Sequence, residues 1–371
     1  MRSWRRESAL AQSHDGAGSE AWVLRDEDVI VERFPVSARY GKPLDILRLR
    51  GEGTVELREY ARQFEQIVQR LYGGHELDTL SGCPCCEQST QSAATVITVY
   101  GVAYLRCGAC GHVFVGAQPT PKALASAFEE EGDLSTFYVD PATLDVRMKE
   151  IIQPKLDWVL DVYRREHGRA PRSLVDIGAG AGHFVAGCRR NGLRAEGYEI
   201  SKSSVRFAKE VFSLDLIHGD YLAQERGDEF DVVTMWGLLE YAPDPGKFIA
   251  AARRQMSAYG GMLILEVPRA DSLSLAVQQQ FADSVWRHAM PDSHMNLFSD
   301  ASLATVLYDN GFRPVAAWYF GMDVYELLMQ IGLRLESEEF LRRFAALVPA
   351  LQSQLDASRF SDDIVVAALP I

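Results

Sequence analysis

The chain of 371 residues has no long apolar run. A membrane-spanning helix needs about 20 consecutive apolar residues, and no stretch reaches that length, so we expect no segment within a membrane. Residues 1–18 contain basic side chains but no apolar stretch behind them, which argues against a secretory signal. The default expectation is a cytoplasmic location, where clustered cysteines more often bind metal than form disulfides.

Basic charge is also scarce. Lys and Arg number 38 against 51 Asp and Glu, which gives a formal net charge of -13. Binding to a phosphate backbone needs a basic face, so this balance disfavours a nucleic acid as the main partner. The hydrophobic share of 47% and the charged share of 24% are ordinary for a globular protein. The length suits two domains, or one large domain with an appendage.

Residues from 173 onwards show strands and helices in alternation, with short β-prone runs between amphipathic segments. This alternation predicts an α/β fold with a parallel sheet that helices cover on both faces. A mostly helical insertion is expected at about residues 324–358, between the last two strands. The seven expected strands are Ser173–Ile177, Ala195–Ile200, Leu214–His218, Phe230–Met235, Gly261–Val267, Pro314–Phe320 and Ile364–Leu369.

The chain before residue 173 is less regular. The Ser-, Ala- and Gly-rich residues 1–20 predict no regular structure, residues 21–50 contain short strand-like runs, and Val55–Leu71 has the apolar spacing of a helix. The predicted division is an N-terminal α+β extension of unknown fold over 1–80, a cysteine module over 81–118, a helical linker or lid over 119–170 and the α/β domain over 171–371.

The first strand of the α/β domain ends in a glycine-rich loop, Gly178-Ala179-Gly180-Ala181-Gly182, that opens a helix. Glycines let a ligand approach the backbone closely, and the helix N-terminus adds unpaired N–H groups and partial positive charge. Dinucleotides and S-adenosylmethionine both bind to loops of this kind. His183 stands at the sixth position, where dinucleotide-binding loops have Gly or Ala, so the loop disfavours a nicotinamide cofactor.

Acidic side chains accompany this loop. Asp176 precedes the first glycine by two residues, and Glu199 ends the next strand, where a carboxylate can accept hydrogen bonds from both ribose hydroxyls. Asp220 follows the third strand and could accept the adenine amino group. The loop and the acids together predict a nucleoside-containing cofactor at the carboxyl ends of the first three strands.

With these motifs in this order, residues 173–320 resemble the class I S-adenosylmethionine-dependent methyltransferases that act on small molecules. Phe230–Pro245 around the fourth strand and Gly260–Pro268 around the fifth also carry the resemblance. It implies a Rossmann-like domain of seven strands. In relatives an aromatic residue of the lead-in can close over the methionine end of the cofactor, and Tyr138 occupies that place. The resemblance implies cofactor binding by Tyr138, Asp176, Gly178, Ala179, Gly180, Gly182, Phe184, Glu199, Ile200, Asp220, Tyr221, Met235 and Trp236.

Five of the six cysteines lie close together in the sequence. Two C-x2-C pairs, separated by a β-prone run, fit the pattern of a zinc site in which four thiolates close a tetrahedral, structural shell. The module resembles a zinc ribbon and, with the domain behind it, the zinc-headed methyltransferases of sugars and natural products. A disulfide or metal-free thiols are the alternatives, and Cys85 could replace Cys83 or Cys86. The expected ligands are Cys83, Cys86, Cys107 and Cys110.

The acceptor side of the site is expected after the fourth and fifth strands. In the zinc-headed relatives a His-containing stretch precedes a Phe-Ser pair, and His294 before Phe298-Ser299 resembles it. His294 is therefore the first candidate for a general base and His288 the second, and the alternative for either ring is a hydrogen bond to its own loop. Glu240 and Tyr241 follow the fourth strand. Many relatives have Leu-Glu-His there, whereas this chain has Leu239-Glu240-Tyr241. A mechanism that uses a histidine at that place is therefore not supported.

The predicted function is methyl transfer from S-adenosylmethionine to a small molecule, such as a sugar nucleotide or a natural-product intermediate. One alternative is an RNA methyltransferase whose cysteine module grips the nucleic acid, but Arg106 is the only basic residue within 81–116. Another is a non-catalytic protein that binds its cofactor or a partner. The sequence indicates neither the acceptor atom nor the oligomeric state.

Overall fold

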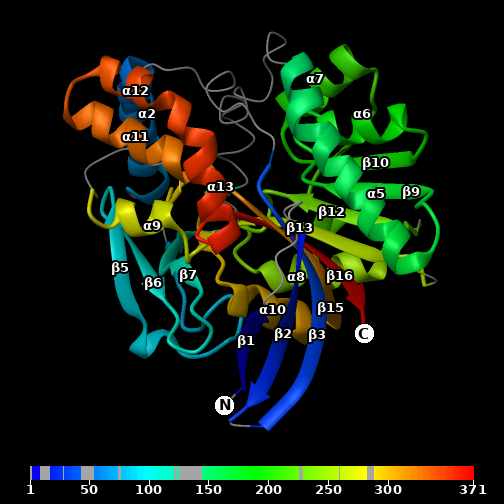
Figure 1. Ribbon diagram of the computed structural model, residues 1–371. Helices are drawn as coiled ribbons and strands as arrows, with labels where there is room; N and C mark the ends of the chain where they lie inside the picture. Colours follow the sequence, from blue (N-terminus) through cyan, green and yellow to red (C-terminus); the bar gives the residue numbers. More distant parts are fainter. Residues whose placement is uncertain are drawn as a thin grey trace.

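The computed structural model describes residues 2–8, 17–27, 29–42, 54–73, 77–120, 123–124, 144–224, 229–258, 260–281 and 288–371. Its largest element is a ten-stranded sheet with the order β1-β2-β3-β15-β16-β13-β12-β9-β10-β11 (Figure 1). The strands of this sheet are β1 (Arg2–Ser8), β2 (Ala17–Asp26), β3 (Val29–Tyr40), β9 (Ser173–Ile177), β10 (Arg194–Glu199), β11 (Ile217–His218), β12 (Val232–Trp236), β13 (Met262–Pro268), β15 (Phe312–Phe320) and β16 (Asp363–Pro370).

Seven of these strands form the predicted Rossmann-like unit. Strands β11, β10, β9, β12 and β13 pair in parallel, and β16 runs antiparallel between β13 and β15. Each of the seven strands that the sequence predicts overlaps one of these seven observed strands. Strands β9, β12 and β13 are almost entirely buried, and most of their residues are Val, Leu, Ile or Met, as expected for strands that are covered on both faces. The α/β fold class is confirmed.

The N-terminal strands extend this unit instead of standing apart from it. Strands β1, β2 and β3 form an antiparallel ribbon, and β3 pairs in parallel with β15. Trp22 and Val36 belong to the same buried core as Val233 and Leu265 of the central strands. The expectation of no regular structure in residues 1–20 is wrong for the described residues 2–8 and 17–20, because a Ser- and Gly-rich composition does not reveal long-range pairing.

Helices cover both faces of the sheet. Leu156 of α5 and Val185 of α6 share a core with Leu174 and Val232, and Ile249 of α8 and Leu303 of α10 share the other core with Val233. The helices of this part are α4 (Leu144–Arg147), a π-helical turn at Met148–Ile152, α5 (Gln153–His167), α6 (His183–Arg190), α7 (Lys202–Phe212), α8 (Pro245–Arg254) and α10 (Asp300–Asp309).

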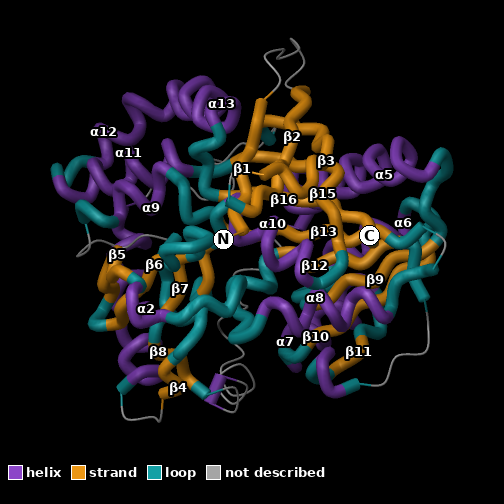
Figure 2. Tube along the Cα trace, turned by 90° about the horizontal axis from the view of Figure 1, so that it is seen from below, coloured by secondary structure: helices purple, strands orange, loops and turns teal. Residues whose placement is uncertain are grey.

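The cysteine module lies beside the large sheet (Figure 2). Its four-stranded sheet has the order β14-β7-β6-β5, and β14 is contributed by the chain after β13. The module therefore shares a strand with the α/β domain. The strands are β4 (Leu77–Thr79), β5 (Ala94–Val99), β6 (Val102–Arg106), β7 (Val113–Val115), β8 (Ala117–Pro119) and β14 (Asn296–Leu297), with β4 and β8 forming a separate pair.

The remaining helices form a lobe next to the module (Figure 1). Three of them lie between β15 and β16, where the sequence predicts a helical insertion. None of the helices in the described ranges has the length and hydrophobicity that a membrane crossing requires. The helices of this lobe are α2 (Thr54–Tyr72), α9 (Leu273–Gln278), α11 (Asp323–Arg334), α12 (Glu338–Phe344) and α13 (Val348–Ser358).

Buried carboxyl groups attach the inserted helices to the sheet. Asp323, at the start of α11, accepts hydrogen bonds from Ser274 Oγ at 2.8 Å and from Asp362 N at 3.0 Å. Gln352 of α13 donates to Asp323 at 3.2 Å and to Asp356 at 2.9 Å. Asp356 is only 2% exposed, and burial raises the pKa of its carboxyl to about 7. This junction is consequently most stable with its carboxyl protonated.

The raised pKa of Asp356 predicts how stability depends on pH. A carboxyl whose folded-state pKa is raised contributes stability below its unfolded pKa and loses it as the pH rises through the folded value. We therefore expect the free energy of unfolding to fall between about pH 4 and pH 7, and Asp356→Asn to make that fall shallower. Urea denaturation at several pH values measures this. Asp161→Asn, at a side chain that is 74% exposed, is the control. An unchanged slope in Asp356→Asn would contradict the assignment.

Candidate functional site

The glycine loop after β9 forms a tight turn against β10. Gly178, Gly180 and Gly182 have φ values of 73°, 53° and 78°, in the left-handed region that favours glycine. The N–H groups of Gly178 and Ala179 both donate to Tyr198 O at 2.9 Å. Helix α6 begins directly after Gly182. The loop therefore lies at the carboxyl edge of the sheet, between the ends of β9 and β10.

Glu199 at the end of β10 is fixed by this loop. Its Oε2 accepts a hydrogen bond from Gly180 N at 2.7 Å, and its Oε1 accepts one from Ser201 N at 2.7 Å. The residue is 9% exposed, and burial raises the pKa of its carboxyl. A carboxylate has about four acceptor positions, so two remain for hydroxyl groups of a ligand. This is the arrangement that the sequence predicts for a ribose site.

Asp220 and Tyr221 follow β11. Asp220 is exposed, and its Oδ1 caps a short 3-10 turn by accepting from Leu222 N at 2.8 Å. The Tyr221 ring lies in the core, 5.0 Å from the Tyr198 ring, and its hydroxyl donates to Gln255 at 2.9 Å. Asp220 thus offers an accessible carboxylate close to the end of β10, whereas Tyr221 presents no free hydroxyl. Ile200 is half-buried between Glu199 and α7.

Asp176 and Trp236 lie on the face of the sheet that α5 and α6 cover. Asp176 is 2% exposed and accepts a hydrogen bond from Thr234 Oγ1 at 2.6 Å, while burial raises the pKa of its carboxyl to about 7. The Trp236 ring packs edge-on against Phe184, with centroids 4.8 Å apart. Its indole N–H has no hydrogen-bond partner in the described part of the chain. Met235, by contrast, is fully buried in the opposite core.

The structure adds charged residues that the sequence analysis missed. Lys155 of α5 forms an ion pair with Glu266 of β13, and its ammonium lies 4.5 Å from the centre of the Trp236 ring. Asp363 opens β16 nearby, and burial raises the pKa of its carboxyl to about 7. The Lys42 ammonium lies 4.5 Å from the centre of the Phe320 ring, and burial together with Lys155 lowers its pKa to about 8. We call Lys42, Lys155, Glu266 and Asp363 the charged cluster.

A signal for one of these residues was present in the sequence. Glu266 is the only charged residue in the apolar strand Met262–Pro268, which is unusual for a strand covered on both faces. Lys42 had no local signal, because it reaches the cluster through the pairing of β3 with β15. Gly41 N donates to Tyr319 O at 2.8 Å and Gly41 O accepts from Trp318, which fixes the chain just before Lys42.

Three of the four predicted acceptor-side residues, Tyr241, His288 and His294, come together beyond β12, whereas the Glu240 side chain lies near Gly237 and the charged cluster. Glu240 is 5% exposed, its Oε2 has no hydrogen-bond partner among the described residues, and burial raises the pKa of its carboxyl strongly. Its Oε1 lies over Gly237, where an added Cβ would be 3.0 Å away. The Tyr241 ring contacts the His294 ring edge-on, with centroids 6.4 Å apart. His294 in turn contacts the backbone of His288.

The two histidines differ in how they are held. His294 Nδ1 donates to His288 O at 2.7 Å, so the neutral ring carries its proton there and leaves Nε2 as an acceptor. Burial and the proximity of His288 lower the pKa of His294 to about 4. The His288 ring is 4% exposed, and its Nε2 contacts the segment between β13 and α9, at Arg269 O (2.8 Å) and Ser272 Oγ (3.1 Å), whereas His294 binds its own loop at His288 O. His294 therefore has the better geometry for accepting a proton.

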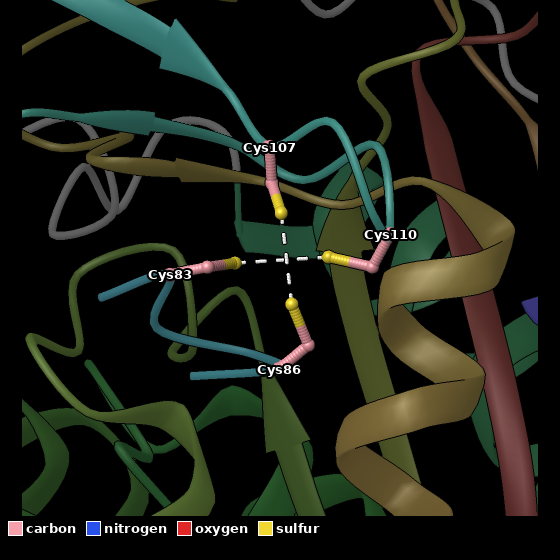
Figure 3. Close-up of side chains that lie close together, drawn as sticks. All are labelled: Cys83, Cys86, Cys107 and Cys110. Carbon is pink, nitrogen blue, oxygen red and sulfur yellow. Dashed lines mark hydrogen bonds between the residues drawn. The ribbon is translucent and has the colours of Figure 1, made fainter. Parts of the chain in front are cut away.

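The four cysteines of the two C-x2-C pairs converge in space. Figure 3 shows their Sγ atoms pointing toward one centre, with all four within 4.8 Å of one another. Cys83 and Cys110 are 3.6 Å apart, as are Cys86 and Cys107. A tetrahedral zinc ion with Zn–S bonds of about 2.3 Å places sulfur atoms roughly 3.8 Å apart, whereas a disulfide needs about 2.05 Å. The thiol set fits a metal shell, and Cys85 lies outside it.

Two parts of the predicted site lie outside the described residues. Tyr138 is one, and residues 282–287 of the segment between the fifth strand and His294 are the other.

Comparisons with known proteins agree with this geometry. Residues 148–317 match the family model described as a methyltransferase domain. The ubiquinone biosynthesis O-methyltransferase of Ralstonia nicotianae is 27% identical over 38% of this chain and 60% of its own length. That of Methylococcus capsulatus is 33% identical over 23% of this chain and 39% of its own length. The chain matches 45–60% of the length of the first three such relatives.

Solved structures give weaker similarities. The magnesium protoporphyrin IX methyltransferase of Synechocystis has a TM-score of 0.44 and 15% identity, over 67% of this chain and 99% of its own. A sugar N-methyltransferase from Streptoalloteichus has a TM-score of 0.27 and 26% identity, over 29% of this chain and 45% of its own. These scores are too low to bear on function.

Proposed function

Residues 148–317 match the family model of a methyltransferase domain, and from this premise we propose that the chain uses S-adenosylmethionine as a class I enzyme and methylates a small-molecule acceptor. The acceptor class that we propose is a sugar nucleotide or a natural-product intermediate. The observation that carries the proposal is the Glu199 carboxylate, held by Gly180 N–H beside the glycine turn. It provides a preorganised acceptor for ribose hydroxyls at the end of β10.

The cofactor would lie along the carboxyl edge of β9, β10 and β12. Glu199 would bind the ribose, exposed Asp220 the adenine amino group, and the glycine loop would pass under the nucleoside. Trp236 and Phe184 would bound the sulfonium end, with buried Asp176 beneath them. The cofactor supplies an electrophilic methyl group, and the protein supplies alignment of the acceptor with the S–CH3 bond. We also propose that the remaining predicted cofactor residues, Tyr138, Ile200, Tyr221 and Met235, shape the surroundings of the cofactor.

The acceptor would enter between Trp236, Glu240 and His294. For a hydroxyl or an acidic carbon as acceptor, S-adenosylmethionine would supply the methyl group, and the acceptor atom would have to lie in line with the S–CH3 bond. His294 Nε2 would take the acceptor's proton, because Nδ1 already donates to His288 O. Tyr241 would hold the ring edge-on. An amine acceptor would need only positioning.

Two observations favour a small molecule over RNA. Arg106, the one basic residue within 81–116, is already paired with Asp271 at 3.1 Å and with Ala270 O at 3.3 Å, so the module presents no basic stripe. The curated relatives are named for O-methyl transfer in ubiquinone biosynthesis, which is chemistry on a small molecule.

The proposed function is tested by transfer of a labelled methyl group from S-adenosylmethionine to a panel of sugar nucleotides and hydroxylated aromatic compounds. Labelled product with one class of acceptor supports it. Tight binding of S-adenosylhomocysteine without transfer to any member would favour the non-catalytic alternative, and transfer to RNA fragments alone would favour the RNA alternative.

We expect Glu199→Gln to weaken the binding of S-adenosylhomocysteine by about tenfold or more. An amide replaces charge-assisted bonds to the ribose hydroxyls, and such bonds are worth about 1.5–3 kcal/mol each. Isothermal titration calorimetry measures the change. Glu196→Gln, on the same strand but outside the loop contact, should bind like the wild type. Equal affinity in both variants would remove Glu199 from the cofactor site.

We expect His294→Ala to lower turnover by roughly 10²–10⁴-fold for an acceptor that must lose a proton, at unchanged affinity for S-adenosylhomocysteine. Because the pKa of His294 is lowered to about 4, the ring stays neutral at pH 5–6 and the wild-type rate should fall only near pH 4. The adjacent variant Ser293→Ala is the control. Full turnover in His294→Ala would exclude the proposed base.

We also propose that Cys83, Cys86, Cys107 and Cys110 hold a structural Zn²⁺ ion. A shell of four thiolates leaves no position for water, so the metal would stabilise the fold instead of entering the chemistry. Protein purified without chelators should contain zinc in an equimolar amount by metal analysis. Cys86→Ser should lose the metal and unfold at lower temperature, whereas Cys85→Ser should keep it. Full zinc content in Cys86→Ser would contradict this ligand set.

A further inference from the structure

The loop that follows β12 is held by Asn296, a residue of β14 in the sheet of the cysteine module. Residues 238–242 form two overlapping turns, in which Tyr241 N donates to Leu238 O at 3.1 Å and Ala242 N donates to Leu239 O at 3.2 Å. We call Leu239–Ala242 the post-β12 loop. It carries Glu240 and Tyr241, and the carbonyl groups of Leu239, Glu240 and Ala242 accept hydrogen bonds from outside the loop.

Asn296 of β14 binds all three of these carbonyls. Its side-chain Nδ2 donates to Leu239 O at 3.2 Å and to Ala242 O at 2.7 Å, and its backbone N donates to Glu240 O at 3.1 Å. Asn296 is fully buried. Without the side-chain Nδ2, Ala242 O would lose its donor among the described residues, and Leu239 O would keep the 3.2 Å bond from Ala242 N. The conformation of the loop therefore depends on this side chain.

The cysteine module sets the orientation of Asn296. Both Nδ2 hydrogens face carbonyls, so Oδ1 is the acceptor that faces His112 Nε2 at 3.1 Å, and the imidazole must donate from Nε2. The fully buried His112 ring lies between Phe114 and Phe298, with centroids 5.7 and 4.8 Å away. His112 O accepts from Cys107 N at 2.8 Å, which places His112 within the second cysteine knuckle.

We propose that Asn296 is a positioning residue through which the cysteine module holds the post-β12 loop in the shape that the acceptor site requires. The chain of contacts runs from the knuckle of Cys107 and Cys110 through His112 to Asn296, and from there to the loop. The pairing of β14 with β7 fixes Asn296 opposite Phe114. The inference rests on the proposed function only in assigning the loop to the acceptor site, because the coupling itself is a property of the fold.

Hydrogen exchange of the full chain tests the coupling without any acceptor. The amides of Tyr241 and Ala242 report whether the loop is closed, and amides of β9 report global unfolding. In Asn296→Asp a carboxylate oxygen replaces the donating Nδ2, so exchange at Tyr241 and Ala242 should rise by at least about tenfold while β9 is unchanged. Binding of S-adenosylhomocysteine should be retained, because the variant leaves Glu199 and its contact with the glycine loop unchanged.

Three further variants separate positioning from general stability. His112→Gln, which can still donate to Asn296 Oδ1, should exchange like the wild type, whereas His112→Phe should behave like Asn296→Asp. Ser299→Ala removes a different contact between the same segment and the module, the 2.5 Å bond from Ser299 Oγ to Cys110 O. It should lower the unfolding temperature without faster exchange in the post-β12 loop.

Metal removal completes the test. Release of the metal with a mercurial and a chelator should raise exchange in the loop of the wild type and add nothing in Asn296→Asp. Unchanged loop exchange in Asn296→Asp, or equal effects of metal removal in both chains, would overturn the inference. If Asn296→Asp does not fold, the pair His112→Phe and His112→Gln decides the matter. A failure of methyl transfer with intact coupling would instead overturn only the proposed function.

Discussion

Charge buried at the carboxyl edge of β9, β12 and β13 is the constraint on which the arrangement of the other parts depends. An ion taken out of water costs several kcal/mol unless a partner or a change of protonation compensates it. Lys155 and Glu266 compensate this cost by pairing with each other. Asp176 accepts a hydrogen bond from Thr234, and the pKa of its carboxyl is raised. Glu240 has no partner for Oε2 among the described residues, and burial raises the pKa of its carboxyl strongly, so a change of protonation compensates its burial. Groups of this kind mark the part of a fold that is built for a ligand.

The same need to compensate buried charge explains the position of the N-terminal strands. A seven-stranded unit would end at β15, and β3 adds a parallel strand there. The chain that leaves β3 runs toward the carboxyl edge and brings Lys42 to the charged cluster, where Glu266 and Asp363 lie opposite it. The extension thus covers the edge of the sheet and also supplies a cation to the site.

The sequence predicted those features whose signal is local. The glycine loop, Glu199 and the strands around them are recognisable because a few adjacent residues dictate each one. The four thiols were predicted from their spacing alone, and they do converge. Features that depend on long-range pairing were missed. Residues 2–8 gave no sign of a strand, Lys42 had no motif, and Asn296 reads as an ordinary residue before an apolar pair. Periodicity describes how one segment meets the core, and it does not say which distant segment lies beside it.

The cysteine module is continuous with the part of the fold in which we propose the acceptor site. A separate domain would meet the methyltransferase unit through exposed side chains, but this module takes β14 from it and buries His112 against Asn296. Tyr104 of the module also donates to His294 O at 2.9 Å. Hydrogen bonds from the same small sheet therefore hold both His294 and the post-β12 loop, the two segments between which we propose that the acceptor binds. Four thiolates around a zinc ion, the ligand set that we propose, would cross-link the two knuckles and stabilise the module. A module fixed in this way would suit the proposed transfer reaction, because an in-line displacement tolerates little error in the position of the acceptor.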